Sequence, residues 1–118
     1  MAKILIVDDS ITSRKILKNI LIENGHEVIG EAINGEDAIS KFKELNPDIV
    51  TMDITMPVMD GLEALKKIME INNSAKVVMV TAAGQKTKIV DAVKYGAVEF
   101  LTKPFESEQI IGIINKIQ

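Results

Sequence analysis

Five residues of this 118-residue chain carry side chains that could bind a metal ion and a phosphoryl group. One of them, Asp53, lies in the stretch DIVTMDITMPVMDG at 48–61, where the residues before it are suited to burial. A buried carboxylate is unfavourable unless a cation or a metal ion pairs with it. The other four each end or follow a similar apolar run: Asp8, Asp9, Thr81 and Lys103. Whether they form one site depends on the elements that carry them.

The apolar runs are short and rich in β-branched residues, and they alternate with longer segments of helical period. They lie at residues 3–7, 27–32, 48–52, 76–81 and 99–102. Most are apolar on both faces, which is typical of buried parallel strands. The pattern predicts an α/β fold with a five-stranded, doubly wound parallel sheet and five helices. Because we find no linker or repeat, we expect residues 1–118 to form a single domain.

The helices are predicted from apolar stripes and from residues that bound helices. Asp60 is a predicted N-cap, while Gly25 and Pro47 are predicted to follow helix ends. The first helix has its stripe at Ile16, Leu17, Ile20 and Leu21. The fourth has its stripe at Ile89, Val90 and Val93, and the fifth is expected to begin near Ser107.

Ligands of a doubly wound sheet bind at the carboxyl ends of its strands. That rule places the five polar residues along one edge, where three carboxylates repel one another unless a cation binds. Only oxygen ligands are on offer, because the chain has no cysteine and its one histidine, His26, is expected in an exposed turn at the opposite end. Oxygen ligands of this kind favour Mg²⁺.

An aspartate beside a metal ion can accept a phosphoryl group as an aspartyl phosphate, provided that positive charge balances the phosphoryl oxygens. Asp53 is the best placed acceptor. A divalent cation and Lys103 together balance the charge of the three carboxylates, and the Thr81 hydroxyl can donate a hydrogen bond to a phosphoryl oxygen.

Composition argues against several other classes of protein. The formal net charge is -3 and we find no basic patch, so neither nucleic acid nor an anionic membrane surface is an expected partner. No apolar run is long enough to span a membrane, and MAKILIVDD at the amino terminus lacks the pattern of a signal peptide. The absence of cysteine is compatible with the cytosol, and we expect a cytoplasmic protein.

The segments ILIVDDS, DIVTMDITMPVMDG, VMVTA and FLTKPF resemble, in order and spacing, the receiver domain of bacterial two-component response regulators. The likeness spans nearly the whole chain, and it is closest to single-domain receivers of the chemotaxis type. The resemblance implies the flavodoxin-like strand order 2-1-3-4-5. It also implies a phosphoacceptor domain and not an enzyme, with self-catalysed phosphotransfer and dephosphorylation at most.

Carried over residue by residue, the resemblance makes Asp53 the phosphoacceptor. It implies that Asp9 and the backbone carbonyl of Thr55 bind Mg²⁺ directly, together with Asp53, and that Asp8 holds water molecules of the metal. Thr55 and Ala83 match the positions that tune the lifetime of the phosphoryl group in this family.

The resemblance also assigns the phosphoryl contacts and the switch. Thr81 and Lys103 are implied to bind the phosphoryl group, and a cis peptide bond is implied between Lys103 and Pro104. Phe100 matches the aromatic switch position. Because phenylalanine lacks the hydroxyl of the tyrosine that many chemotaxis members carry there, its switching is expected to depend on packing alone.

The implied partners are a sensor histidine kinase and an output protein, of which a flagellar-motor switch protein is the chemotaxis example. The output face is expected on helix four, strand five and helix five, with Ile89 and Ile113 facing outward beside Phe100. We expect a monomer. The chain stops at Gln118 without a DNA-binding module, which favours a stand-alone regulator.

Several alternatives remain open at this point. Within the family, the chain could serve a non-chemotaxis phosphorelay, could come from a transcriptional regulator, or could be a degenerate receiver that acts as a scaffold. Outside it, a Mg²⁺-dependent phosphohydrolase would also use an aspartate nucleophile, but Asp53-Ile54-Thr55 lacks the second acid of its D-x-D pattern. A flavodoxin-like FMN binder would share the fold, but DDSITSR is acidic where the FMN phosphate must lie.

Overall fold

The computed structural model describes residues 1–82 and 84–118, apart from the side chain of residue 86. Parallel strands form one sheet in the order β2-β1-β3-β4-β5. Their bounds are β1 Lys3–Val7, β2 Glu27–Ala32, β3 Ile49–Asp53, β4 Lys76–Thr81 and β5 Glu99–Thr102. The predicted fold class and strand order are confirmed, and only the third strand is shifted, by one residue toward the carboxyl terminus.

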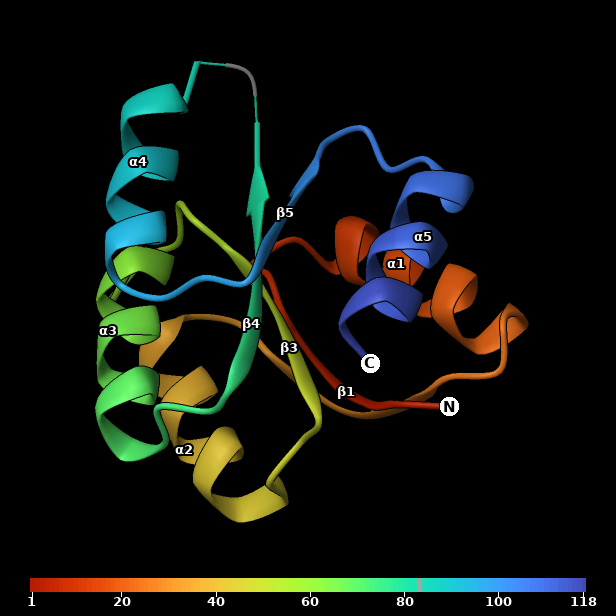
Figure 1. Cartoon of the computed structure of the whole chain (residues 1–118), viewed down its shortest axis with the longest axis horizontal. Coiled ribbons are helices and arrows are strands. Elements are labelled where there is room, and N and C mark those ends of the chain that lie inside the picture. Colours follow the sequence, from red (N-terminus) through yellow and green to blue (C-terminus); the bar gives the residue numbers. More distant parts are fainter. Residues whose placement is uncertain (83) are drawn as a thin grey trace.

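Five helices cover the two faces of this sheet. They are α1 Ile11–Glu23, α2 Gly35–Leu45, α3 Gly61–Ile71, α4 Lys86–Lys94 and α5 Ser107–Ile117. Figure 1 shows α2, α3 and α4 on one side of the strands and α1 and α5 on the other. Among the described helices, none is both long and apolar enough to cross a membrane.

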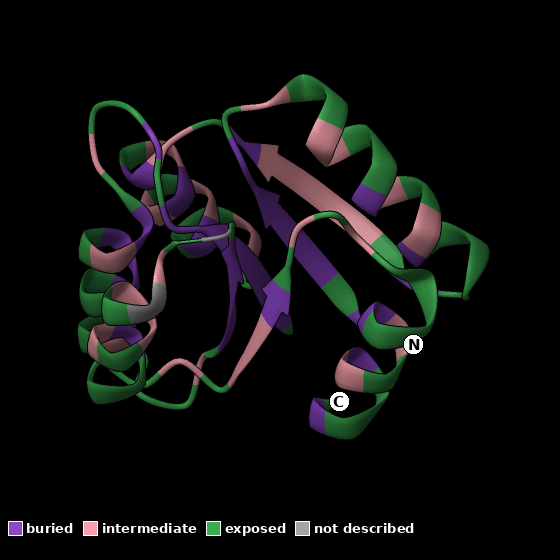
Figure 2. Cartoon of the chain, turned by 90° about the horizontal axis from the view of Figure 1, so that it is seen from above, coloured by how far each residue is buried: buried purple, intermediate pink, exposed green. Residues whose placement is uncertain are grey.

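The sheet divides the hydrophobic core into two clusters, because successive side chains of a strand point to opposite faces. Leu5 and Val7 of β1 belong to the cluster under α2, α3 and α4, whereas Ile4 and Ile6 belong to the cluster under α1 and α5. Figure 2 shows the central strands as the buried layer, with partly exposed helices outside them. The carboxyl ends of the strands are thus held between two packed layers.

Side-chain caps begin the first three helices. Ser10, Asn34 and Asp60 each accept a hydrogen bond from the backbone N–H three residues further on. The predicted N-cap at Asp60 is confirmed. Gly25, with φ of 84°, follows α1 in the left-handed region, where glycine is favoured, and α2 ends before Pro47 as predicted.

Two of the predicted apolar stripes are wrong in part. Ile16 of α1 is half exposed, and Val90 and Val93 of α4 are 57% and 58% exposed. Among the described side chains of α4, Ala92 is buried and Ile89 is half buried. Apolar residues lie on more than one side of each helix, so their spacing alone could not say which side packs on the sheet.

The expectation of an exposed His26 is also wrong. This histidine is buried at the opposite end of the sheet from the acidic residues, and its Nδ1 accepts a hydrogen bond of 3.1 Å from the Ala2 N–H. Burial, together with the charge of the amino terminus, lowers the pKa of His26. The position of His26 is fixed by tertiary structure, since its partner Ala2, 24 residues away, is itself a buried core residue.

Candidate functional site

The acidic residues lie together at the carboxyl ends of the central strands. Asp8 directly follows β1, and Asp53 is the last residue of β3. Both are buried, whereas Asp9 is exposed. Carboxylate oxygens of the three residues all lie within 4.8 Å of one another. The structure therefore brings Asp8, Asp9 and Asp53 together as the strand-end rule predicted.

Lys103 lies against this cluster from the loop after β5. Its Nζ is 2.9 Å from Asp8 Oδ2 and 3.6 Å from Asp53 Oδ2. The backbone N–H of Lys103 donates to the Thr81 carbonyl over 2.9 Å, which holds the loop beside β4. The peptide bond between Lys103 and Pro104 is cis, as the resemblance implied. Burial acts to lower the pKa of Lys103, but the carboxylates of Asp8 and Asp53 outweigh it, and the pKa is raised.

The surroundings of Asp53 shift the pKa of its carboxyl group. Burial, reinforced by the charge of Asp8, raises the pKa of Asp53 from 3.8 to about 6, although Lys103 acts in the opposite direction. One lysine thus leaves the three carboxylates with excess negative charge. A bound divalent cation would remove that excess.

The donor set fits Mg²⁺. The cluster offers only carboxylate and carbonyl oxygens, and its one exposed member, Asp9, leaves the ion open to water and to an incoming phosphate oxygen. Thr55, whose carbonyl the resemblance adds to this set, lies two residues after Asp53 in an exposed loop. The residues present can therefore hold the ion that the sequence predicted.

Gly61, the first residue of α3, fixes the loop that follows Asp53. Its N–H donates to the Ile54 carbonyl over 2.7 Å. A Cβ at this position would lie 2.0 Å from the Asp53 carbonyl oxygen, so only glycine fits. This role was not predicted, although the glycine after the Asp60 cap was a visible signal of close approach.

Gln85, just before α4, was also missed. Its Nε2 donates to Thr55 Oγ1 and its Oε1 accepts from the Ala82 N–H, each over 2.7 Å. Thirty residues separate Gln85 from Thr55, so no local pattern could have revealed the contact. Ala83, which the resemblance pairs with Thr55, lies outside the described residues.

The predicted phosphoryl and switch residues lie on the strands next to the cluster. Thr81 ends β4 and is buried, and its hydroxyl donates to the Leu101 carbonyl over 3.4 Å. Phe100 of β5 is half buried and packs against the core under α2, α3 and α4. Ile89 and Ile113 were expected to face outward, but both are half buried, and Ile113 packs against the core under α1 and α5.

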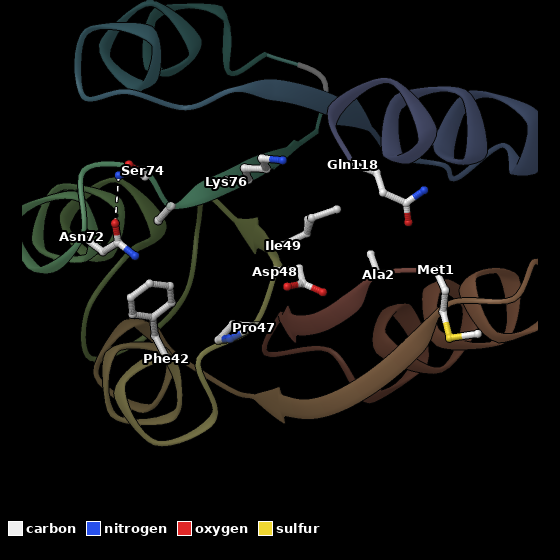
Figure 3. Close-up of a pocket in the computed structure, with 11 residues that line it drawn as sticks. Met1, Ala2, Phe42, Pro47, Asp48, Ile49, Asn72, Ser74, Lys76 and Gln118 are labelled. Atoms are coloured by element: carbon white, nitrogen blue, oxygen red, sulfur yellow. Dashed lines mark hydrogen bonds between the residues drawn. The ribbon is translucent and has the colours of Figure 1, made fainter.

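A separate cavity of about 300 Å³ lies at the amino ends of the strands. Figure 3 shows Ala2, Ile49 and Lys76 in its wall, together with Phe42 and Asp48. The acidic cluster lies at the other ends of the same strands. The cavity therefore takes no part in the site built around Asp53.

Comparison with known proteins agrees with this geometry. The family model of the response regulator receiver domain matches residues 4–115. The chain is 48% identical to the chemotaxis protein CheY of Thermotoga maritima over 115 residues, which cover 98% of this chain and 96% of that protein. It is 49% identical to the chemotaxis protein CheY of Bacillus subtilis, over 97% of this chain and 95% of that protein.

Solved structures show the same likeness. A CheX–CheY–BeF₃–Mg²⁺ complex from Borrelia burgdorferi contains a chain with a TM-score of 0.92 and 38% identity, covering 98% of this chain and 87% of that one. The response regulator domain of Thermotoga maritima CheB matches with a TM-score of 0.85 and 38% identity, over 98% and 92% of the two chains. With its fold, its acidic strand ends and these relatives in agreement, the chain belongs to the family of response regulator receiver domains.

Proposed function

We propose that Asp53 accepts a phosphoryl group from the phosphohistidine of a sensor histidine kinase and that the phosphorylated chain changes its affinity for a protein partner. Membership of the receiver family makes the chain a phosphorylation-dependent signalling switch and favours this function over a phosphohydrolase or an FMN binder. The observation that supports Asp53 most directly is its position in the acidic cluster, with Lys103 Nζ 3.6 Å away.

The transfer forms one bond and breaks one. A carboxylate oxygen of Asp53 attacks phosphorus, the bond from phosphorus to the histidine nitrogen breaks, and that nitrogen keeps the electron pair. Lys103 moves its hydrogen bonding from Asp8 toward the phosphoryl oxygens, and the Thr81 hydroxyl turns from the Leu101 carbonyl to donate to one of them. Asp9, Asp53 and the Thr55 carbonyl would hold Mg²⁺ directly, and Asp8 would hold its water molecules; the ion would supply the remaining positive charge. Later, water attacks phosphorus, the bond from phosphorus to the Asp53 oxygen breaks, and inorganic phosphate leaves the free carboxylate behind.

The change at Asp53 reaches the partner through Thr81, Phe100 and the face of α4, β5 and α5. When Thr81 turns toward the phosphoryl group, the space next to Phe100 changes, and the ring shifts the balance between two arrangements of that face. Ile89 and Ile113 contribute their exposed parts to it, and Val90 and Val93 add exposed apolar surface on α4. A surface of this kind fits a protein partner.

By analogy with the chemotaxis relatives, we place the chain as a cytoplasmic, monomeric regulator whose protein partner is a flagellar-motor switch protein or a protein like the CheX of the Borrelia complex. A receiver of another phosphorelay would use the same site with a different output protein. Partner capture with and without the phosphoryl mimic BeF₃⁻ separates these two cases.

The decisive experiment is phosphorylation by acetyl phosphate with Mg²⁺, followed by intact-mass measurement and peptide mapping. The parent protein should gain one phosphoryl group on the peptide that contains Asp53. Asp53→Asn should gain none, whereas Asp60→Asn, which keeps a side-chain oxygen for the cap of α3, should behave like the parent. Equal uptake by Asp53→Asn would show that the acceptor is another residue.

A further inference from the structure

The chain bends sharply between the two acidic residues that follow β1. Consecutive side chains of an extended strand point to opposite faces, and Asp8 is buried while Asp9 is exposed. Their carboxylates nevertheless reach one cluster with Asp53. The peptide group that joins Asp8 to Asp9 must therefore hold one particular orientation if both acids are to face the same ion.

Hydrogen bonds from three directions fix Asp8. Its N–H donates to the Ala32 carbonyl over 3.0 Å, and its Oδ1 accepts from the Ser10 N–H over 2.9 Å. Its carbonyl, which belongs to the peptide group between the two acids, accepts from Arg14 Nη1 over 2.7 Å. Arg14 is thus the side chain that holds this peptide group from the helix side.

Arg14 is itself held in place by β2. Its Nε donates to Glu31 Oε1 over 3.0 Å, and only 12% of its side chain is exposed. Lys18 lies 3.3 Å from the other oxygen of Glu31, and Lys41 donates to the Glu31 carbonyl. The planar guanidinium binds two acceptors at fixed angles, which an ammonium group cannot do. It therefore joins α1, β2 and the Asp8–Asp9 peptide group rigidly.

We infer that Arg14 is a positioning residue of the Mg²⁺ site, which holds the Asp8–Asp9 peptide group so that both carboxylates meet the ion. The inference rests on the proposed binding of Mg²⁺. Two effects of Arg14 on that binding have opposite signs: its positive charge disfavours a cation, whereas its hydrogen bond favours the ligand geometry. The Glu31 carboxylate, 3.0 Å from the guanidinium, offsets part of its charge, and we therefore expect the geometric effect to be the larger one.

Isothermal titration with Mg²⁺ tests the inference on three variants. Arg14→Met should weaken Mg²⁺ binding by about tenfold, as expected when a residue that orients metal ligands is removed. Arg14→Lys should also weaken Mg²⁺ binding, although the charge is kept. An ammonium group lacks the planar set of N–H groups that bind the Asp8 carbonyl and the Glu31 carboxylate together. Lys18→Met is the matched control, since Lys18 shares Glu31 but donates no bond to Asp8, and its affinity should stay within about twofold of the parent.

The outcomes separate the inference from its alternatives. Unchanged Mg²⁺ affinity in Arg14→Lys, or tighter binding in Arg14→Met, would overturn the inference. Either result would mean that Arg14 acts on the site only through its charge, or only stabilises the fold through its ion pair with Glu31. Urea unfolding without Mg²⁺ shows which variants are folded, and Arg14→Lys remains informative if Arg14→Met is not. A parent protein that binds no Mg²⁺ would instead refute the proposed function.

Discussion

The side-chain amide of Gln85 donates a hydrogen bond of 2.7 Å to the hydroxyl of Thr55. Gln85 precedes α4, and Thr55 lies two residues after Asp53, so the bond connects the start of the proposed output helix to the loop beside the proposed acceptor. The same carboxamide accepts from the Ala82 N–H, next to Thr81. One side chain thus joins both loops that flank Asp53.

Amide exchange tests this connection in the unphosphorylated protein. Gln85→Ala should make the Ala82 N–H exchange roughly fivefold faster, because a hydrogen bond of this kind contributes about 1 kcal/mol. Gln85→Glu is the matched control, since it keeps the acceptor for Ala82 and loses the donor to Thr55. The control should leave Ala82 protected. The same rate in Gln85→Ala and in the parent would show that the bond does not form in solution.

Stability without Mg²⁺ should depend on pH through Asp53. Since its pKa rises from 3.8 to about 6 on folding, the folded state binds this proton more tightly than the unfolded state. The free-energy cost of burying the charged carboxylate is therefore fully present above pH 6 and absent below pH 3.8. Screening by water limits the effect to about 1–2 kcal/mol.

Urea unfolding of the parent and Asp53→Asn across this pH range provides the measurement. The free energy of unfolding of the parent should fall relative to that of Asp53→Asn as the pH rises from 4 to 6. Taking the difference between the two proteins removes the contribution of the other acidic groups. A difference that stays constant across the range would contradict the raised pKa.

Mg²⁺ should raise the melting temperature at pH 7, because an ion that binds only the folded state stabilises it by mass action. Asp9→Asn should remove most of this shift, since Asp9 is the exposed carboxylate of the cluster and a proposed ligand of the ion. Differential scanning calorimetry with increasing Mg²⁺ measures the effect. Asp60→Asn controls for the loss of a negative charge elsewhere, and an equal shift in Asp9→Asn and Asp60→Asn would exclude Asp9 as a ligand.

Gly61→Ala should destabilise the fold by about 3 kcal/mol or more, because its Cβ would lie 2.0 Å from the Asp53 carbonyl oxygen and the backbone must move. Gly112→Ala is the matched control on α5, where no atom lies within 4 Å of the added carbon. This helical position should gain about 0.5–1 kcal/mol from alanine. Chemical denaturation of the two variants gives both values, and similar stabilities would contradict the close approach at Gly61.

Thr51→Val should stabilise the protein by about 1 kcal/mol, since it removes a polar atom that lacks a partner and keeps the shape of the side chain. Thr51 is buried in β3, and among the described residues its Oγ1 is the buried side-chain atom without a hydrogen bond. Thr81→Val, which deletes a bonded hydroxyl, should not stabilise. Denaturation midpoints of the two variants decide between these outcomes.

Much of the fold could be predicted because it depends on local pattern. β-branched runs gave four of the five strands their exact bounds, and Asp60 was found because a cap bonds to its own helix. The strand order came from the family resemblance and not from the pattern. The faces of α1 and α4 could not be predicted, since Ile16 and Val90 are as apolar as the residues that pack inward.

The site divides in the same way. Asp8, Asp9 and Asp53 could be placed together because parallel strands end at one edge. Arg14 and Gln85 could not be found, since each acts through tertiary hydrogen bonds whose partners no periodicity marks. The burial of His26 could not be predicted for the same reason, because its hydrogen-bond partner Ala2 is 24 residues away in the sequence.

The sheet divides the core into two layers, and substitutions in the two layers reach the site through different residues. Asp53 shares its strand face with Ile49, in the layer of α1 and α5, whereas Thr81 shares its face with Met79, in the layer of α2, α3 and α4. Repacking the first layer should act on the site through Asp53, and repacking the second should act on it through Thr81. The acceptor and the phosphoryl contact are thereby open to separate adjustment, in evolution or in engineering, by substitutions that never touch the acidic edge.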